Sequence, residues 1–300
     1  MLARGLAPVR GSSLTDAVDL AIELRAQGLR VDIERTPPNP LSSPEDPAWR
    51  EYRAVALPEA CAALTALERA GFAQAGGVTI AADPVGALVP TFAEWPSGTT
   101  SGRAALRVVA EQAQEARIPL TLADGADSTV PALIDLAREF QVDGLSVALT
   151  LAAARRRSAA DCATYEGPIR LVKGGRGAAE RSSAERFRVP LEVDKSFIRC
   201  VKARLTAGLA VSVATHDGRL IQIIRAVAHR LRCAPGSVEY VLTVGRNARL
   251  QRQLVQEGEA VRVIVPYGSP GLDGLDGMVT AVRAALARPA SLVSAWGKER

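Results

Sequence analysis

The chain has 300 residues, of which 48% are hydrophobic and only 4% are aromatic. Its 37 Lys and Arg residues against 32 Asp and Glu give a formal net charge of +5, and the basic residues are scattered rather than clustered with aromatic ones. Such a chain is long enough for one large α/β barrel, and its mild charge argues against a nucleic-acid-binding surface.

Helical periodicity and apolar segments alternate along the whole chain. A first helix is predicted over Leu14 to Gln27, which Ser13 or Thr15 can cap. Five prolines between Thr36 and Pro47 predict an irregular loop. Strands are predicted at Leu29 to Glu34, Val78 to Ala82, Pro119 to Ala123, Gly144 to Leu149, Ile169 to Val172, Ala210 to Ala214, Val238 to Thr243 and Ala260 to Val265. Further helices are predicted near Ala48 and from Pro58 to Ala70, Arg103 to Ala116, Thr129 to Phe140, Ser158 to Tyr165, Pro190 to Ala207, Asn247 to Glu257 and Leu275 to Ala287. Another helix is predicted after Thr215-His216-Asp217 and continues through His229.

Strands joined by helical crossovers pair in parallel. The pattern therefore predicts a single (β/α)8 barrel that forms one domain over residues 1–300, with an N-terminal helix and a final helix over the barrel mouth. A doubly wound open sheet is the competing arrangement, but no G-x-G-x-x-G follows the first strand to support it.

Ligands of such a barrel bind where the strands end at their carboxyl side. In the stretch IRLVKGGR the fifth strand ends in Lys173, Gly174 and Gly175, so a cation lies beside glycines that let a backbone approach a ligand. An ordinary solvated basic turn is the alternative. The residues predicted at the strand ends are Asp124, Arg170, Lys173, Thr215, His216 and Tyr267.

Other polar residues favour structural interpretations. His216 can be a capping residue at a helix start, and Arg155 to Arg157 is predicted to be a solvated helix start. The loop from Gly174 to Arg188 is predicted to be either a lid over the site or a plain loop.

The four cysteines are far apart in the sequence, form no C-x-x-C pair, and with two histidines offer no zinc-type spacing. Residues 1–11 lack the apolar core of a signal peptide, and no apolar run reaches about 18 residues. We therefore expect a cytoplasmic protein with no metal and no membrane span.

Four motifs in this order resemble the proline dehydrogenase family: RLVKGG, VATHD, VRVIVPYG and the closing ARPAS. The resemblance covers the chain from about Leu14 to Ser291. It implies a barrel that holds non-covalent FAD and oxidises proline to its cyclic imine by hydride transfer to flavin N5.

The resemblance also implies roles for single residues. Arg170 matches the family's arginine near flavin N5, and Lys173 and Gly174 match its pyrophosphate and ribityl contacts. Thr215 and His216 match a Thr-His pair on the cofactor phosphates. Asp124 matches the family's aspartate after the third strand, with a slip of about one residue.

The substrate side departs from the family, so free proline is a poor fit. Of the ion-pairing residues on the last helix only Arg283 remains, and Arg176 replaces a tyrosine and is the candidate for a new substrate contact. The other replaced positions are Ala81, Ala152, Thr243, Ile264, Thr280, Ala284 and Ala287.

Three hypotheses follow. The first is a flavin-dependent oxidoreductase that acts on a proline derivative or another amine and passes electrons to an unknown acceptor. The second is a non-catalytic or repurposed barrel in which flavin is lost or structural. The third is an ordinary proline dehydrogenase.

Overall fold

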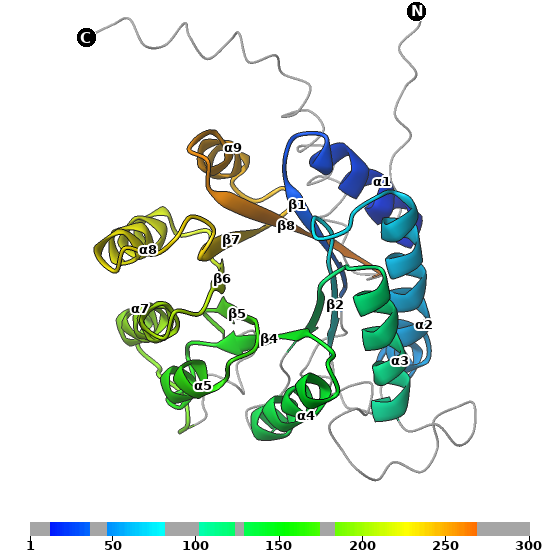
Figure 1. Ribbon diagram of the computed structural model, residues 1–300, viewed down its shortest axis with the longest axis horizontal. Helices are drawn as coiled ribbons and strands as arrows, with labels where there is room; N and C mark the ends of the chain where they lie inside the picture. Colours follow the sequence, from blue (N-terminus) through cyan, green and yellow to red (C-terminus); the bar gives the residue numbers. More distant parts are fainter. Residues whose placement is uncertain (1–12, 37–46, 82–101, 124–128, 175–183, 269–300) are drawn as a thin grey trace, which may run out of the picture.

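The computed structural model describes residues 13–36, 47–81, 102–123, 129–174 and 184–268 (Figure 1). Its eight strands form a closed barrel in the order β1-β2-β3-β4-β5-β6-β7-β8, which confirms the predicted (β/α)8 fold. The strands are β1 (Arg30–Arg35), β2 (Val78–Ala81), β3 (Leu120–Ala123), β4 (Val147–Ala152), β5 (Ile169–Val172), β6 (Val211–Ala214), β7 (Val238–Thr243) and β8 (Ala260–Tyr267). The helices are α1 (Leu14–Arg25), α2 (Pro47–Arg69), α3 (Gly102–Glu115), α4 (Val130–Val142), α5 (Ser158–Thr164), α7 (Pro190–Thr206), α8 (Gly218–Arg230) and α9 (Ala248–Gln256).

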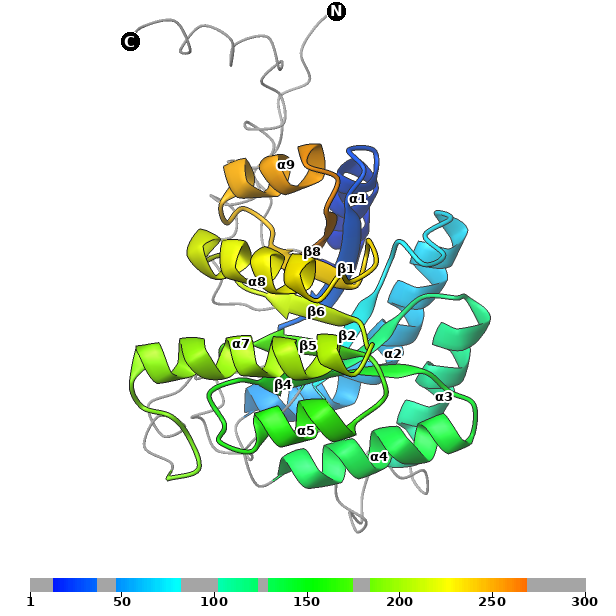
Figure 2. The same ribbon diagram turned by 60° about the vertical axis from the view of Figure 1, so that its left-hand side comes forward.

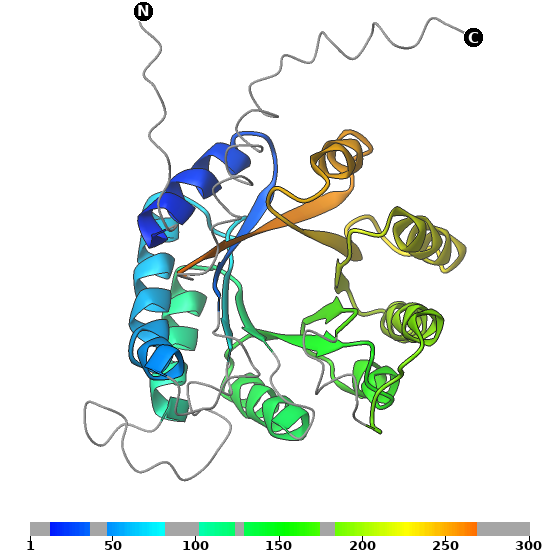
Figure 3. The ribbon, with the colours of Figure 1, turned by 180° about the vertical axis from the view of Figure 1, so that it is seen from behind.

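Every strand pair is parallel, and β8 closes the barrel by pairing with β1 from Arg30↔Arg262 to Arg35↔Tyr267. The open doubly wound sheet is therefore wrong. The helices form an outer ring, seen from both sides in Figures 1 and 3. Helices α5, α7 and α8 lie side by side along one flank (Figure 2).

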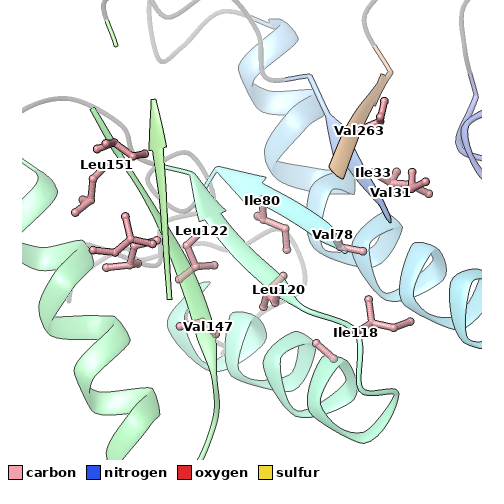
Figure 4. Close-up of a cluster of buried hydrophobic side chains, with 14 of the residues drawn as sticks. Val31, Ile33, Val78, Ile80, Ile118, Leu120, Leu122, Val147, Leu151 and Val263 are labelled. Carbon is pink, nitrogen blue, oxygen red and sulfur yellow. The ribbon is translucent and has the colours of Figure 1, made fainter. Parts of the chain in front are cut away.

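Alternation along the strands divides the barrel into an apolar layer and a polar interior. The apolar side chains of Val31, Ile33, Leu120 and Leu122 are buried in the core that joins strands and helices (Figure 4). Residues between them on the same strands, such as Asp32 and others described below, point to the opposite face. The hydrophobic core thus lies outside the sheet, and the barrel interior is left for polar groups.

Local signals explain where most elements begin and end. Ser13 caps α1, with Asp16 N–H donating to Ser13 Oγ at 3.2 Å and the Asp16 carboxylate accepting from Ser13 N–H at 2.9 Å. This reciprocal capping box is the reason that the helix begins where the sequence predicts.

Two elements differ from the sequence prediction by more than a shift of one or two residues at an end. Helix α2 continues through Pro58, although a proline removes one helical hydrogen bond, because its neighbours Tyr52, Leu57 and Leu64 are buried. Strand β4 begins three residues later than predicted, because Gly144 (φ 78°) still belongs to the turn that ends α4.

The final helix predicted at residues 275–287 lies outside the described residues, so its place over the barrel mouth stays a prediction. In the part of the chain that the structure describes, no helix is both long and apolar enough to cross a membrane.

Candidate functional site

An ion pair crosses the barrel from β5 to β1. These strands are on opposite sides of the closed barrel, four positions apart in either direction, so a contact between them must pass through the interior. The Arg170 Nη2 group donates to Asp32 Oδ2, and both residues are buried, with 5% and 0% of their surface exposed. Arg170 therefore lies inside the barrel.

Two threonines complete this interior network. Thr79 Oγ1 on β2 lies 3.1 Å from both carboxylate oxygens of Asp32 and accepts from Arg170 Nη1 at 2.9 Å. Thr121 Oγ1 on β3 accepts from Arg170 Nη2 at 3.3 Å. The guanidinium is thus held by residues of three strands on the far side of the barrel.

Arg170 stays charged in this interior. Burial by itself would lower the pKa of Arg170, but the Asp32 carboxylate outweighs it and raises the pKa above its ordinary value. Its Nε–H is buried and has no hydrogen-bond partner among the described residues. An unmatched buried donor costs about 1–3 kcal/mol, so a ligand acceptor at this nitrogen would stabilise the site.

Lys173 lies just beyond the end of β5, where it contacts two carboxylates. Its Nζ is 2.8 Å from Asp194 Oδ1 on α7 and 3.3 Å from Asp217 Oδ2 at the start of α8. Arg219 Nη2 lies 3.0 Å from Asp194 Oδ2, so two cations face two carboxylates. The lysine side chain is 36% exposed, and the described residues use two of the three N–H donors of its ammonium in the contacts to Asp194 and Asp217.

Thr215 and Asp217 belong to the same turn between β6 and α8. The Asp217 carboxylate caps α8 by accepting from the N–H groups of Arg219 at 3.0 Å and Leu220 at 3.3 Å. Thr215 Oγ1 accepts from Asp217 N–H at 3.2 Å, and Thr215 is buried. The residue that caps α8 is therefore Asp217, and the interpretation of His216 as a capping residue is wrong.

His216 presents an unused ring nitrogen. Its Nε2 accepts a long hydrogen bond, 3.4 Å, from the backbone N–H of Thr243, which makes Nδ1 the protonated nitrogen of the neutral ring. Burial, and next the charge of Arg246, lower the pKa of His216 from its ordinary value. The ring is neutral at pH 7, and its Nδ1 is buried with no partner among the described residues.

Gly174 is required by its backbone and by its neighbours. Its φ is +86°, and a Cβ at this position would lie 2.5 Å from the Cβ of Ala152 at the end of β4. The ends of β4 and β5 therefore pack so closely that only a residue without a Cβ fits at position 174.

The structure brings only some of the predicted site residues together. Lys173 and Thr215 meet at Asp217, whereas no hydrogen bond or ion pair between described residues joins Arg170 to Lys173, Thr215 or His216. Three predicted residues lie outside the described residues: Asp124, Arg176 and Arg283.

The prediction of a solvated helix start at Arg155 to Arg157 is wrong for Arg155, which is only 2% exposed. An antiparallel bridge pairs it with Arg186, and this bridge fastens the segment before α7 to the loop after β4. Arg157 does lie at the surface, paired with Asp161.

Sequence reasoning missed Asp32, Thr79 and Thr121. The signal for Asp32 was present, because it is a carboxylate between two apolar residues in a strand whose alternation makes it face the interior. The threonines gave no signal, because threonine is common on strands of any kind.

The donor set is compatible with a flavin dinucleotide. Arg170 Nε and His216 Nδ1, two of the buried N–H donors that lack a partner among the described residues, could each donate to a ligand, and Lys173 Nζ adds a positive charge. A diphosphate and a flavin ring supply acceptors for such donors.

No family model matches the chain. Proline dehydrogenase 2 of Bacillus subtilis strain 168 is 31% identical over 100 residues, which is 33% of this chain and 32% of that relative. The proline dehydrogenase of Deinococcus radiodurans is 34% identical over 100 residues, which is 33% of this chain and 31% of the relative. The matched stretch thus spans about a third of these relatives' own length.

Solved structures of proline utilization A share the barrel. The protein from Bdellovibrio bacteriovorus, inactivated by N-propargylglycine, has a TM-score of 0.69 at 17% identity and covers 97% of this chain and 34% of its own. A variant from Bradyrhizobium japonicum has a TM-score of 0.64 at 17% identity and covers 90% of this chain and 29% of its own. The resemblance to the proline dehydrogenase family is confirmed.

Proposed function

We propose that this relative of the proline dehydrogenases is an FAD-dependent oxidoreductase that oxidises a proline derivative or another amine to the imine. The observation that carries the proposal is that Arg170 Nε and His216 Nδ1 are buried donors without a partner among the described residues, in a barrel whose sequence relatives are proline dehydrogenases. We further propose that residues 1–300 act as one barrel domain, in the cytoplasm.

Bound FAD would supply hydride acceptance at flavin N5. Lys173, Thr215 and His216 would hold the diphosphate with an ammonium, a hydroxyl and a ring N–H. Gly174, whose positive φ turns the backbone at the end of β5, would contact the cofactor through its backbone. Arg170 would keep a fixed positive charge beside the flavin, where negative charge develops during the reaction.

The substrate proposal rests on residues that the chain lacks. The family's substrate glutamate and second arginine are replaced here by Ala287 and Ala284. A charge-assisted hydrogen bond contributes about 1.5–3 kcal/mol, so losing several weakens binding of free proline by orders of magnitude. Arg283 and Arg176 are the proposed substrate contacts, and Asp124 the proposed catalytic carboxylate.

Proline itself is the second candidate substrate. It is favoured by the 31–34% identity of the matched stretch to proteins named proline dehydrogenase. It requires that other residues supply the carboxylate contact that Ala284 does not offer.

An absorbance spectrum tests the cofactor, and bleaching tests the substrate. The purified protein, incubated with FAD and then freed of unbound FAD by desalting, should show the flavin bands, and the exposed Lys202→Gln should leave them unchanged. L-prolinamide or pyrrolidine should bleach the bound flavin faster than L-proline does. Protein that stays colourless with added FAD refutes the proposal, and bound flavin that no amine bleaches indicates the repurposed barrel.

A further inference from the structure

We infer that Asp32 and Thr79 are positioning residues that set the direction of the free Arg170 Nε–H toward the flavin. This inference rests on the proposed function, because the proposed acceptor for that N–H is the bound cofactor. Neither residue lies at a strand end, so neither was a candidate in the sequence.

A guanidinium is a rigid planar fork with five N–H donors. Asp32 and Thr121 occupy Nη2, and Thr79 occupies Nη1. Fixing both terminal nitrogens of a planar group also fixes the direction of the third nitrogen. The Nε–H that remains without a partner therefore has one orientation, which the far side of the barrel determines.

Two other buried arginines, Arg262 and Arg204, use their nitrogens differently. Arg262 spends Nε on Glu239 at 3.1 Å, and Arg204 directs Nε at the Ala210 carbonyl at 3.3 Å. Both arginines serve to join segments of the barrel. Arg170 is as buried as they are, yet the network binds its two terminal nitrogens and leaves Nε free. Arg35, which pairs with Glu59, also leaves a buried Nε without a partner among the described residues, so Arg170 is distinguished by its place in the barrel interior, where both of its terminal nitrogens are held.

Thr79 holds the Arg170 guanidinium and the Asp32 carboxylate in a fixed orientation to each other. Its hydroxyl faces both oxygens of the Asp32 carboxylate and also accepts from Arg170. Without it, the guanidinium could rotate on the carboxylate. Asp32 supplies charge as well as position, because its carboxylate offsets one of the buried cations in the barrel interior.

The first test uses the protein without cofactor. In ¹⁵N NMR spectra of arginine Nε–H groups, a resonance assigned by its loss in Arg170→Lys should exchange slowly with water. Asp32→Asn and Thr79→Val should broaden or remove this signal, whereas Thr79→Ser, which keeps the hydroxyl, should retain it. A signal that is unchanged in Thr79→Val would overturn the inference.

The second test measures the affinity for FAD and the reduction potential of the bound flavin by equilibration with redox dyes. Asp32→Asn should shift the potential to more positive values, because an uncompensated cation stabilises the reduced flavin. Thr79→Val should shift it to less positive values, Thr79→Ser should restore it, and the Kd for FAD should change less than threefold.

Thr150→Val is the matched control, because Thr150 is a buried threonine in register with Arg170 that makes no hydrogen bond to its guanidinium among the described residues. Potentials that are equal in all variants, or a shift in Thr150→Val as large as in Thr79→Val, overturn the inference and leave the proposed function intact. A wild-type protein that binds no FAD refutes both.

Discussion

Arg262 on β8 donates from Nε to the Glu239 carboxylate on β7 at 3.1 Å, and its Nη1 also bonds the backbone carbonyls of Val31 and Gly76. Arg30 and Ser212 donate to the same carboxylate, at 3.0 and 2.9 Å. This cluster joins the seam where the barrel closes. Glu239 is the acceptor on which three of these donors depend.

Glu239→Gln should lower the free energy of unfolding at pH 7 by about 3 kcal/mol, because it leaves the buried Arg262 without its counter-charge. Urea unfolding followed by circular dichroism measures this. Glu192→Gln, which breaks a half-exposed pair with Lys195, should cost less than about 1 kcal/mol. Equal losses in the two variants would contradict the prediction.

The same cluster makes stability depend on pH. Burial acts to raise the pKa of Glu239, but Arg262, Arg30 and Ser212 outweigh it and hold the pKa below the ordinary value of 4.5. The unfolded chain therefore binds a proton first, and the stabilisation present above pH 4.5 is lost as the pH falls through the folded-state pKa. The free energy of unfolding, measured from pH 6 to about pH 3, should depend less on pH in Glu239→Gln than in the wild-type protein.

Arg204 is a buried cation whose described partners are backbone carbonyls. It donates to Tyr165 and, at 2.9 and 3.0 Å, to Gly167 and Ala210. Arg204→Leu should lower the free energy of unfolding by about 3 kcal/mol, because several buried acceptors are left unmatched. The exposed Lys202→Leu on the same helix should change it by less than about 0.5 kcal/mol. A similar cost for both would show that the carbonyls find water instead.

Hydrophobic alternation predicted the barrel because each strand places one apolar face against the helices, a property that local sequence records. The stretch from Ile169 to Val172 is a strand with the predicted bounds for this reason. The partner of Arg170 could not be predicted in the same way. Asp32 is separated from it by 138 residues, and only the closure of the barrel brings β1 opposite β5.

The strand-end cations illustrate the same limit. A sequence shows that Lys173 and Thr215 follow strands, but not that Asp194 and Asp217 neutralise the lysine. Those carboxylates come from α7 and α8, whose positions depend on the packing of complete helices. Charge at a strand end can therefore be predicted from sequence, whereas net charge at a site cannot.

Gly174→Ala should be more destabilising than an ordinary glycine substitution at positive φ. Its added Cβ would lie 2.5 Å from the Ala152 Cβ, so the ends of β4 and β5 would have to separate. Gly208→Ala is the control, because Gly208 has φ +73° and no atom within 4 Å of the added Cβ. We expect a loss of about 1 kcal/mol for Gly208→Ala and about 1–3 kcal/mol more for Gly174→Ala. Thermal unfolding measures both losses. Equal losses would show that backbone strain alone determines the loss of stability.

His216 should take up its proton only below pH 6.5, its ordinary pKa, because burial and then Arg246 disfavour the charged ring and lower its pKa. A depressed histidine pKa means that the unfolded chain takes up the proton first, so stability falls as the pH drops below 6.5 toward the folded-state value. Imidazole ¹³C NMR titration of His216, compared with His229 in the same protein, measures the shift. Arg246→Gln should raise the pKa of His216 toward its ordinary value. A pKa that does not respond would leave burial as the sole cause.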